Sequence, residues 1–130
     1  DMSENFNVEI ITPEKTILKA EASEVSIPSY EGELGILKDH ISLITFLRPG
    51  VIIIQKNKQE KYFIEEGTVE FKNNNLLILT STIINLENLE LNLIDEMIKK
   101  TEEKMLKKEI NDKEIYLLSY KIDTLKQLRN

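Results

Sequence analysis

The sequence predicts an α+β protein in which an N-terminal β-sandwich of short antiparallel strands precedes a C-terminal antiparallel two-helix hairpin. Three observations predict this arrangement. Short apolar stretches separated by turn signals fill residues 6–84, a pattern typical of a sandwich or barrel. All three prolines and all four glycines lie before residue 68. Beyond Thr82 the apolar residues recur at helical spacing instead. We therefore expect two domains, residues 1–85 and residues 86–130.

Alternation of apolar and polar residues predicts the first strands. Phe6, Val8 and Ile10 alternate with polar residues, which indicates a strand with one buried face. A further strand segment is expected within residues 17–27, ended by Pro28.

Later strands are expected at residues 51–54, 62–71 and 76–80. The first of these is a run of four β-branched apolar residues, typical of a strand buried on both faces. Gly67 is expected to form a bulge or bend. Residues 29–37, which contain two glycines, are expected to form a loop.

Two helices are expected after residue 86. Asn88 can cap the first, and Asn111 with Glu114 three residues later resembles the capping box that begins the second. The recurring positions of the first helix are Leu89, Leu93, Met97, Thr101 and Met105, with Ile94 and Ile98 beside them. Those of the second helix are Ile115, Leu118, Ile122 and Leu125. Such narrow seams predict that the helices pack against each other and lean on the sandwich or on a partner.

Composition excludes several classes of protein. The 130 residues are 41% hydrophobic and 31% charged, as in a folded globular chain. The formal net charge of −6, without a basic stripe, argues against a nucleic-acid partner. The chain has no cysteine. No run reaches the roughly 18–20 apolar residues of a membrane span, so no direct membrane insertion is expected.

The groups needed for catalysis are scarce. His40 is the one histidine, its neighbour Asp39 is poorly placed to orient it, and no third group is indicated near Ser42. Glu31 and Glu33, without histidine or further acids, make a weak metal site. No glycine-rich phosphate loop follows a predicted strand. We therefore expect a non-catalytic protein, with no metal and no cofactor, that acts by binding other proteins.

The segment from Ser29 to Leu37 combines its glycines with Tyr30, Leu34 and two carboxylates. This mixture suits a protein interface, because glycine allows backbone angles closed to other residues. An ordinary surface turn explains the same composition equally well. Composition leaves both interpretations open.

Several stretches together resemble a known family. They are Val8-Glu9-Ile10-Ile11-Thr12-Pro13-Glu14, then Glu31-Gly32-Glu33-Leu34-Gly35-Ile36, then His40 and Thr45, and then Arg48-Pro49-Gly50-Val51-Ile52. With the change from strands to a terminal hairpin, they make the chain similar to the epsilon subunit of F-type rotary ATP synthases. The resemblance covers essentially the whole chain.

The resemblance implies a non-catalytic rotor component of a proton-translocating synthase that links the gamma subunit to the membrane-embedded c-ring. It implies that the c-ring is contacted by Glu31, Gly32, Glu33 and Leu34. It implies that gamma is contacted by Thr12, His40 and Thr45.

The resemblance also implies a role for the hairpin. In bacterial members the hairpin can leave the sandwich and extend along the shaft, which restrains ATP hydrolysis. Contact with acidic loops of the catalytic beta subunits is then implied for Lys121, Lys126 and Arg129, and the alpha and beta subunits are implied as further partners. An ordinary solvated helix face explains the same charges. No transit peptide is recognised, so we expect a peripheral location on the cytoplasmic face of the bacterial inner membrane, with an organellar inner membrane as the alternative.

The chain departs from the family in three places. Some bacterial members bind ATP through an I/L-D-x-x-R-A motif, but the arginine position holds Leu93 or, in the alternative register, Ile98. Lys38 and Asp39 replace the common Pro-Gly before the histidine, and the helix seams are bulky. The missing arginine argues against nucleotide binding, because no guanidinium is left to bind phosphate. Two alternative functions are kept beside the rotor subunit: a nucleotide-binding sensor, and a helical-hairpin adaptor unrelated to the synthase.

Overall fold

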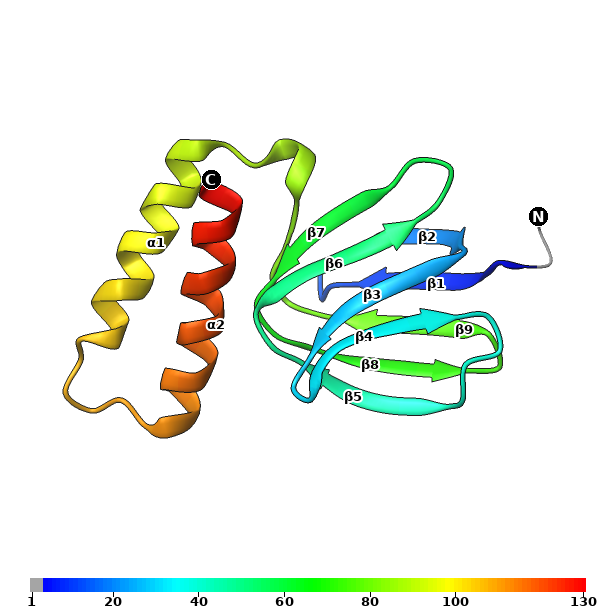
Figure 1. Cartoon of the computed structure of the whole chain (residues 1–130), viewed down its shortest axis with the longest axis horizontal. Coiled ribbons are helices and arrows are strands. Elements are labelled where there is room, and N and C mark those ends of the chain that lie inside the picture. The colour runs from blue at the N-terminus through cyan, green and yellow to red at the C-terminus, as the bar shows by residue number, and fades with distance from the viewer. Residues whose placement is uncertain (1–3) are drawn as a thin grey trace.

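The N-terminal part of the chain folds into a β-sandwich (Figure 1). The structure, a computed structural model, describes residues 4–130. Its strands pair in the order β10-β7-β6-β3-β5-β8-β9-β1-β2, and β4 pairs with β3 beside this path. In chain order they are β1 (Phe6–Ile11), β2 (Thr16–Ala22), β3 (Glu24–Ser29), β4 (Gly32–Leu37), β5 (Leu43–Leu47), β6 (Gly50–Gln55), β7 (Glu60–Ile64), β8 (Gly67–Lys72), β9 (Asn75–Leu79) and β10 (Ile83–Asn85). The predicted sandwich is confirmed.

One curled sheet supplies both layers of the sandwich. β3 joins the layers, because residues 24–26 pair with β6 while Ser29 pairs with Leu47 of β5. The strand pairs are antiparallel, as expected, apart from β1 and β9, which run parallel. These two strands are far apart in the chain, so no hairpin turn sets their relative direction.

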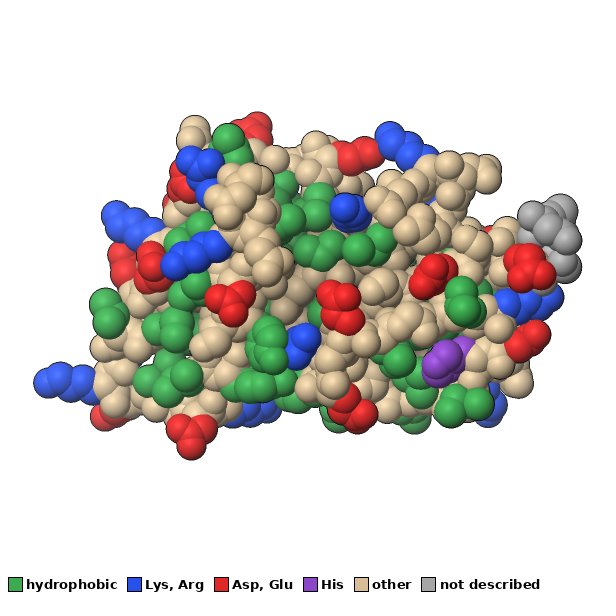
Figure 2. Space-filling model, in the orientation of Figure 1, with side chains coloured by type: hydrophobic (Ala, Val, Ile, Leu, Met, Phe, Trp, Pro, Cys, Tyr) green, Lys and Arg blue, Asp and Glu red, His purple; other side chains and the backbone are tan. Residues whose placement is uncertain are grey.

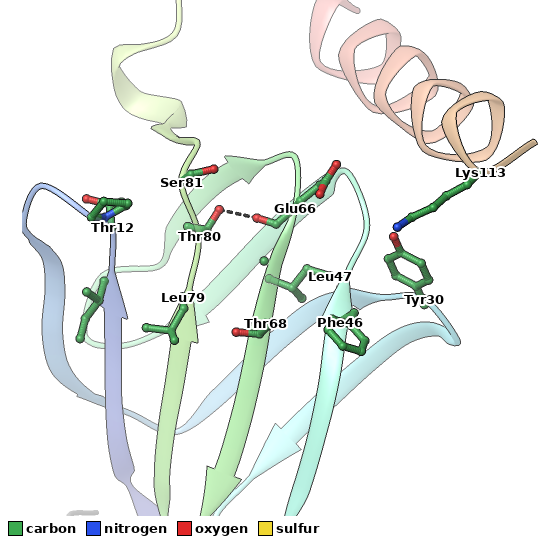
Figure 3. A pocket seen from close by; sticks show the side chains of 13 residues that line it. Thr12, Tyr30, Phe46, Leu47, Glu66, Thr68, Leu79, Thr80, Ser81 and Lys113 are labelled. Atoms are coloured by element: carbon green, nitrogen blue, oxygen red, sulfur yellow. Dashed lines mark hydrogen bonds between the residues drawn. The ribbon is translucent and has the colours of Figure 1, made fainter. Parts of the chain in front are cut away.

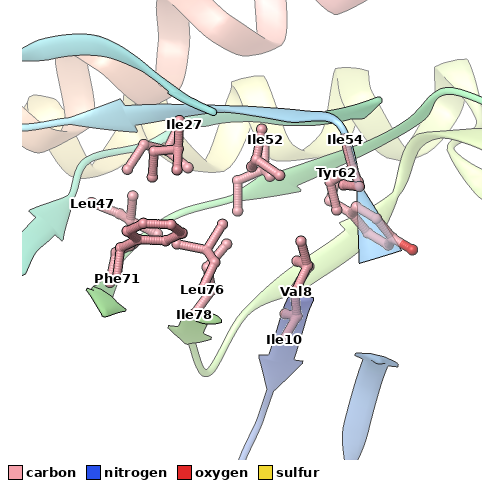
Figure 4. Close-up of a cluster of buried hydrophobic side chains, with 14 of the residues drawn as sticks. Val8, Ile10, Ile27, Leu47, Ile52, Ile54, Tyr62, Phe71, Leu76 and Ile78 are labelled. Atoms are coloured by element: carbon pink, nitrogen blue, oxygen red, sulfur yellow. The ribbon is translucent and has the colours of Figure 1, made fainter. Parts of the chain in front are cut away.

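The sandwich core takes alternate residues from the strands, as the period-two pattern predicts. In β1, Phe6, Val8 and Ile10 are buried, whereas Asn7 is exposed. Figure 4 shows core side chains of both layers meeting. All members lie within residues 6–78, so this core is complete without the helices. They are Phe6, Val8, Ile10, Ala22, Val25, Ile27, Ile36, Leu47, Ile52, Ile54, Tyr62, Ile64, Val69, Phe71, Leu76 and Ile78.

Two expectations about the early strands are wrong. Residues 17–27 belong to two strands separated at Ser23, whose N–H and hydroxyl both donate to Gln55 O. Pro28 lies inside β3 and does not end it. Proline lacks only the N–H donor, and the Pro28 carbonyl still accepts from Arg48 N–H at 3.0 Å.

Two helices follow the sandwich, α1 (Leu91–Met105) and α2 (Asp112–Arg129), which confirms the predicted hairpin. The expected cap at Asn88 is wrong: residues 86–88 form a 3₁₀ helix capped by Asn85, and α1 begins without a side-chain cap. The capping box of α2 is confirmed. Asn111 Oδ1 accepts from Glu114 N–H at 2.8 Å, and Glu114 Oε1 accepts from Asn111 N–H at 3.4 Å.

α2 lies between α1 and the sandwich (Figure 1), and a small second cluster joins the three parts. Its buried members are Phe63 of β7, Ile94 of α1 and Leu125 of α2. The expected seams hold in part: Thr101 and Leu125 are fully buried, whereas Leu93 is 40% exposed and Ile115 is 39% exposed. The outward-pointing ring of Phe63 is the apolar surface available to the helices, so the helix sides that face it become buried.

β6 is fully buried on one face only. Ile52 and Ile54 lie in the core, whereas Val51 and Ile53 on the opposite face are half-buried. That face is where α2 packs against the strand, and its cover is partial. The expectation that this run is buried on both faces therefore holds only in part.

Gly67 allows a close approach of two strands. The strand expected over residues 62–71 is two strands, β7 and β8, separated by a bend at residues 65–66 directly before Gly67. Gly67 begins β8 in regular register with Leu47, so the expected bend lies beside it and a bulge is not formed there. A Cβ at Gly67 would lie 2.5 Å from Leu79 O and 3.2 Å from Thr80 Cβ. The backbone oxygen belongs to a paired strand and cannot turn aside as the end of a side chain can.

Gly67→Ala is expected to destabilise the fold by about 1–3 kcal/mol, the usual cost of overpacking. Urea unfolding of the full chain measures this. Gly35→Ala is the matched control, because its Cβ would meet only the flexible end of the Glu24 side chain, at 3.3 Å. Equal unfolding free energies for the two variants would contradict the close-approach argument.

Candidate functional site

The acidic segment expected as a loop is mostly a strand. Residues 32–37 form β4, and only Tyr30 and Glu31 remain as a two-residue turn between β3 and β4. Gly32 follows the turn with a φ of +124°, a conformation that residues with a side chain rarely adopt. The Ser29 hydroxyl donates to Gly32 O at 2.6 Å. The hairpin therefore ends in a narrow tip held by local hydrogen bonds, called the acidic tip below (residues 30–33).

The acidic tip presents two carboxylates to solvent. Glu31 and Glu33 are exposed. Leu34 is half-buried and packs against the sandwich core, on the same side of β4 as buried Ile36. Of the residues expected to contact the c-ring, the two glutamates are thus available to a partner, whereas Leu34 points inward.

Thr12, His40 and Thr45 do not form one surface. Thr12 lies at the end of β1 and is buried. His40 lies at the other end of the same layer, with its ring edge against Phe71 at 5.9 Å. Thr45 is paired with buried Val69 and shares its inward-facing side of the sheet.

An exposed apolar strip lies on the outer face of β5, β8, β9 and β1, and sequence reasoning missed it. Phe46, Leu79 and Ile11 lie in one row across the sheet, interrupted by Thr68. Phe46 is 60% exposed, and Ile44 on the same face of β5 is 75% exposed. Alternation within β5 could not reveal the strip, because apolar side chains occupy both faces of that strand. We call Ile11, Ile44, Phe46 and Leu79 the apolar strip.

A groove of about 850 Å³ leads from the apolar strip to the helices (Figure 3). Phe46 and Leu79 line it, and Lys113 of α2 points toward the Tyr30 hydroxyl at the helical end. Burial, with a smaller contribution from the charge of Glu66, raises the pKa of the Tyr30 hydroxyl. Apolar walls with a polar rim are typical of protein-binding surfaces.

The basic residues expected to bind other subunits all pair within the chain. Lys121 is 9% exposed, and its Nζ lies 2.5 Å from Glu65 Oε1 at the end of β7. This pair joins α2 to the sandwich. The other two join α2 to α1: Lys126 with Glu102 at 3.8 Å, and Arg129 with Asp95 at 2.6 Å.

Within residues 4–130, no group of three or more histidine, cysteine or acidic side chains is placed to hold a metal. His40 Nδ1 lies 2.8 Å from Ile41 O. Leu93 and Ile98, at the two possible positions of the family's ATP-binding arginine, supply no planar donor for phosphate. On the face shown in Figure 2, acidic and basic side chains are interspersed over the helices.

Comparison with known proteins agrees with this geometry. The family model of the ATP synthase delta/epsilon chain β-sandwich domain matches residues 5–86. The ATP synthase epsilon chain of Pelagibacter ubique is 49% identical over 129 residues, which are 98% of this chain and 99% of that relative. A second relative, the epsilon chain of Parvibaculum lavamentivorans, is 28% identical over 99% of this chain and 98% of its own length.

A solved structure shares the fold. A chain of the Euglena gracilis mitochondrial ATP synthase, described with OSCP, F1 and the c-ring, superimposes with a TM-score of 0.79 at 17% identity. The match covers 97% of this chain and 82% of that one. The sandwich match and the near full-length identity to an epsilon chain together show that this chain belongs to the ATP synthase epsilon family.

Proposed function

We propose that this chain works in the central stalk of a proton-translocating F-type ATP synthase, where it links the gamma subunit to the c-ring. The near full-length identity to an ATP synthase epsilon chain carries the proposal. The geometry supports it, because the sandwich offers two separate exposed surfaces, the acidic tip and the apolar strip. The chain acts as a non-catalytic subunit without a cofactor.

The acidic tip is the surface proposed to bind the c-ring. Glu31 and Glu33 stand exposed at the end of a hydrogen-bonded hairpin, so their carboxylates are presented on a backbone that needs little ordering on binding. Gly32 between them keeps the tip narrow. Leu34 contributes by anchoring β4 to the core instead of touching the ring.

The apolar strip is the surface proposed to bind gamma. Exposed apolar patches mark protein interaction sites, since burying them against a partner removes apolar area from water. Thr12 and His40 lie at the two ends of the same layer, and Thr45 lies on its inner side. We therefore still propose that gamma binds this layer of the sandwich, as the resemblance implies. The residues of β5 proposed to touch gamma are Ile44 and Phe46.

The hairpin is proposed to regulate ATP hydrolysis by leaving the sandwich. Among the described residues, three side chains are buried in the cluster that holds it, against sixteen in the sandwich core. Burial of apolar side chains therefore contributes less to the attachment of the hairpin than to the stability of the sandwich core. Lys121, Lys126 and Arg129 are paired in the docked state. Exchanging their partners for carboxylates of the beta subunits would keep these three cations paired and leave Glu65, Glu102 and Asp95 to water.

The chain is proposed to lie peripherally on the cytoplasmic face of the bacterial inner membrane, with an organellar inner membrane as the alternative. Over residues 4–130, neither helix is both long and apolar enough to cross a bilayer. Attachment is therefore proposed through gamma and the c-ring.

Ile44→Ser combined with Phe46→Ser is expected to weaken binding to purified gamma about tenfold or more, because two apolar side chains no longer leave water on association. Isothermal calorimetry measures the affinity. Leu106→Ser is the control, since Leu106 is 83% exposed in the loop between the helices. Unchanged affinity of the double variant would rule out the apolar strip as the gamma surface.

Glu31→Lys combined with Glu33→Lys is expected to reduce ATP-driven proton pumping severalfold at unchanged subunit assembly, because reversed charges at an interface are repelled by groups that complement the native ones. Pumping is followed by fluorescence quenching in vesicles that contain the reconstituted synthase. Glu103→Lys, on the exposed side of α1, changes charge in the same direction away from the tip. Equal pumping by both variants would exclude the acidic tip from the coupling contact.

Removal of residues 88–130 is expected to leave synthase assembly intact, because the sandwich core lies within residues 6–78. It is expected to raise the rate of ATP hydrolysis by the assembled complex, since the proposed restraint is then missing. Subunit stoichiometry after purification and steady-state hydrolysis are the two measurements. Loss of assembly would show that the hairpin is structural.

A further inference from the structure

Tyr30 is held from two sides. Its N–H donates to Phe46 O of β5 at 3.1 Å, and its ring lies 6.4 Å from the ring of Phe46. On the helical side its carbonyl accepts from the hydroxyl of Tyr116 at 3.1 Å, and the two tyrosine rings lie 5.7 Å apart. Because Tyr30 directly precedes Glu31, the position of the acidic tip depends on a contact from α2.

The contact between Tyr116 and Tyr30 is supported by a second contact of α2, made by Tyr120. The Tyr116 ring packs against the Tyr120 ring at 4.9 Å, and the Arg48 guanidinium lies 3.9 Å from the centre of the Tyr120 ring. Such a cation–π contact is worth about 0.5–1 kcal/mol at exposed sites and more when desolvated. Arg48 N–H in turn donates to Pro28 O at the end of β3. α2 therefore contacts the base of the acidic tip at two places, at Tyr30 through Tyr116 and at Arg48 through Tyr120.

The bond from Tyr116 acts on the backbone of the turn. A side-chain contact could break while the turn kept its shape, but a hydrogen bond to Tyr30 O acts on the peptide unit shared by Tyr30 and Glu31. The next residue, Gly32, has the widest choice of backbone angles, with φ at +124° here. Without the Tyr116 hydroxyl, this flexible residue leaves the turn with fewer restraints.

We propose that docking of α2 holds the acidic tip in one conformation through Tyr116 and Tyr120, so that release of the hairpin loosens the tip. This deepens the proposed function, on which it rests for the tip being a partner-binding surface. By linkage the coupling is reciprocal: a partner that holds the tip in the same conformation favours the docked hairpin, and an undocked hairpin weakens binding at the tip.

The test uses the full chain alone. In Tyr116→Phe, hydrogen exchange is measured by NMR at the Tyr30 amide, which donates to Phe46 O, and at the Gly32 amide, in the residue paired with Ser29. Both are expected to exchange about three- to tenfold faster, the effect of one ordinary hydrogen bond. Tyr62→Phe is the matched control: it deletes another tyrosine hydroxyl, which donates to Glu60 Oε1 at 2.6 Å on β7. In Tyr62→Phe, the amide hydrogens of the acidic tip are expected to exchange at the wild-type rate.

The effect of the tip on the docking of α2 is tested with Tyr30→Leu, which keeps the backbone carbonyl of residue 30 and removes the aromatic ring. Faster exchange along α2, with the β8 and β9 amides unchanged, is the expected result. Unchanged exchange at the tip in Tyr116→Phe would overturn the proposal, as would equal acceleration throughout the sandwich, which would mark a general loss of stability. Because neither gamma nor the c-ring is present, such a failure rejects the coupling alone, whereas the charge reversals at Glu31 and Glu33 test the proposed function.

Discussion

Burial of β7 on both faces connects the two parts of this molecule. Tyr62 and Ile64 point into the sandwich core, while Phe63 between them points outward and is fully buried beneath the helices. Departure of the hairpin would expose Phe63 at a cost of roughly 1.5–3 kcal/mol, without opening the core behind it. The sandwich core would therefore stay closed if the hairpin left it, as proposed. This separation of core and docking surface follows from the alternation of side chains along this one strand.

The ion pair between Lys121 and Glu65 sets where the hairpin docks more than how tightly it docks. The side chains of the pair are 11% and 29% exposed, so both lose much of their hydration on docking, and attraction between them offsets that loss. If the helix left, as proposed, water would reach both groups and neither charge would stay buried without a partner. Docking strength then comes mainly from the small apolar cluster, and the pair selects the register of α2 along the ends of the strands.

Much of the fold could be predicted from the sequence because its local signals agree with the tertiary structure. Phe6, Val8 and Ile10 alternate as a half-buried strand requires, and the Asn111 capping box begins α2. The features that the sequence predicted wrongly depend on residues far away in the chain. Ile94 rather than Leu93 turns inward because Phe63, thirty residues away in sequence, supplies the apolar surface. Helical periodicity locates an apolar stripe to within one position, and the partner decides which neighbour is buried.

The candidate site was only partly predictable for a related reason. Glycines and carboxylates singled out the segment that contains the acidic tip, whose role as a binding surface stays a prediction. Hydrophobic patterns do not mark the side of α2 that faces it. The sandwich presents a backbone carbonyl, a guanidinium and a carboxylate to that helix, at Tyr30, Arg48 and Glu65. Groups of this kind are met by Tyr116, Tyr120 and Lys121, whose long side chains pair polar ends with apolar stems. A docking surface of this composition can exchange its hydrogen bonds for water one by one, and it therefore suits a helix that leaves and returns.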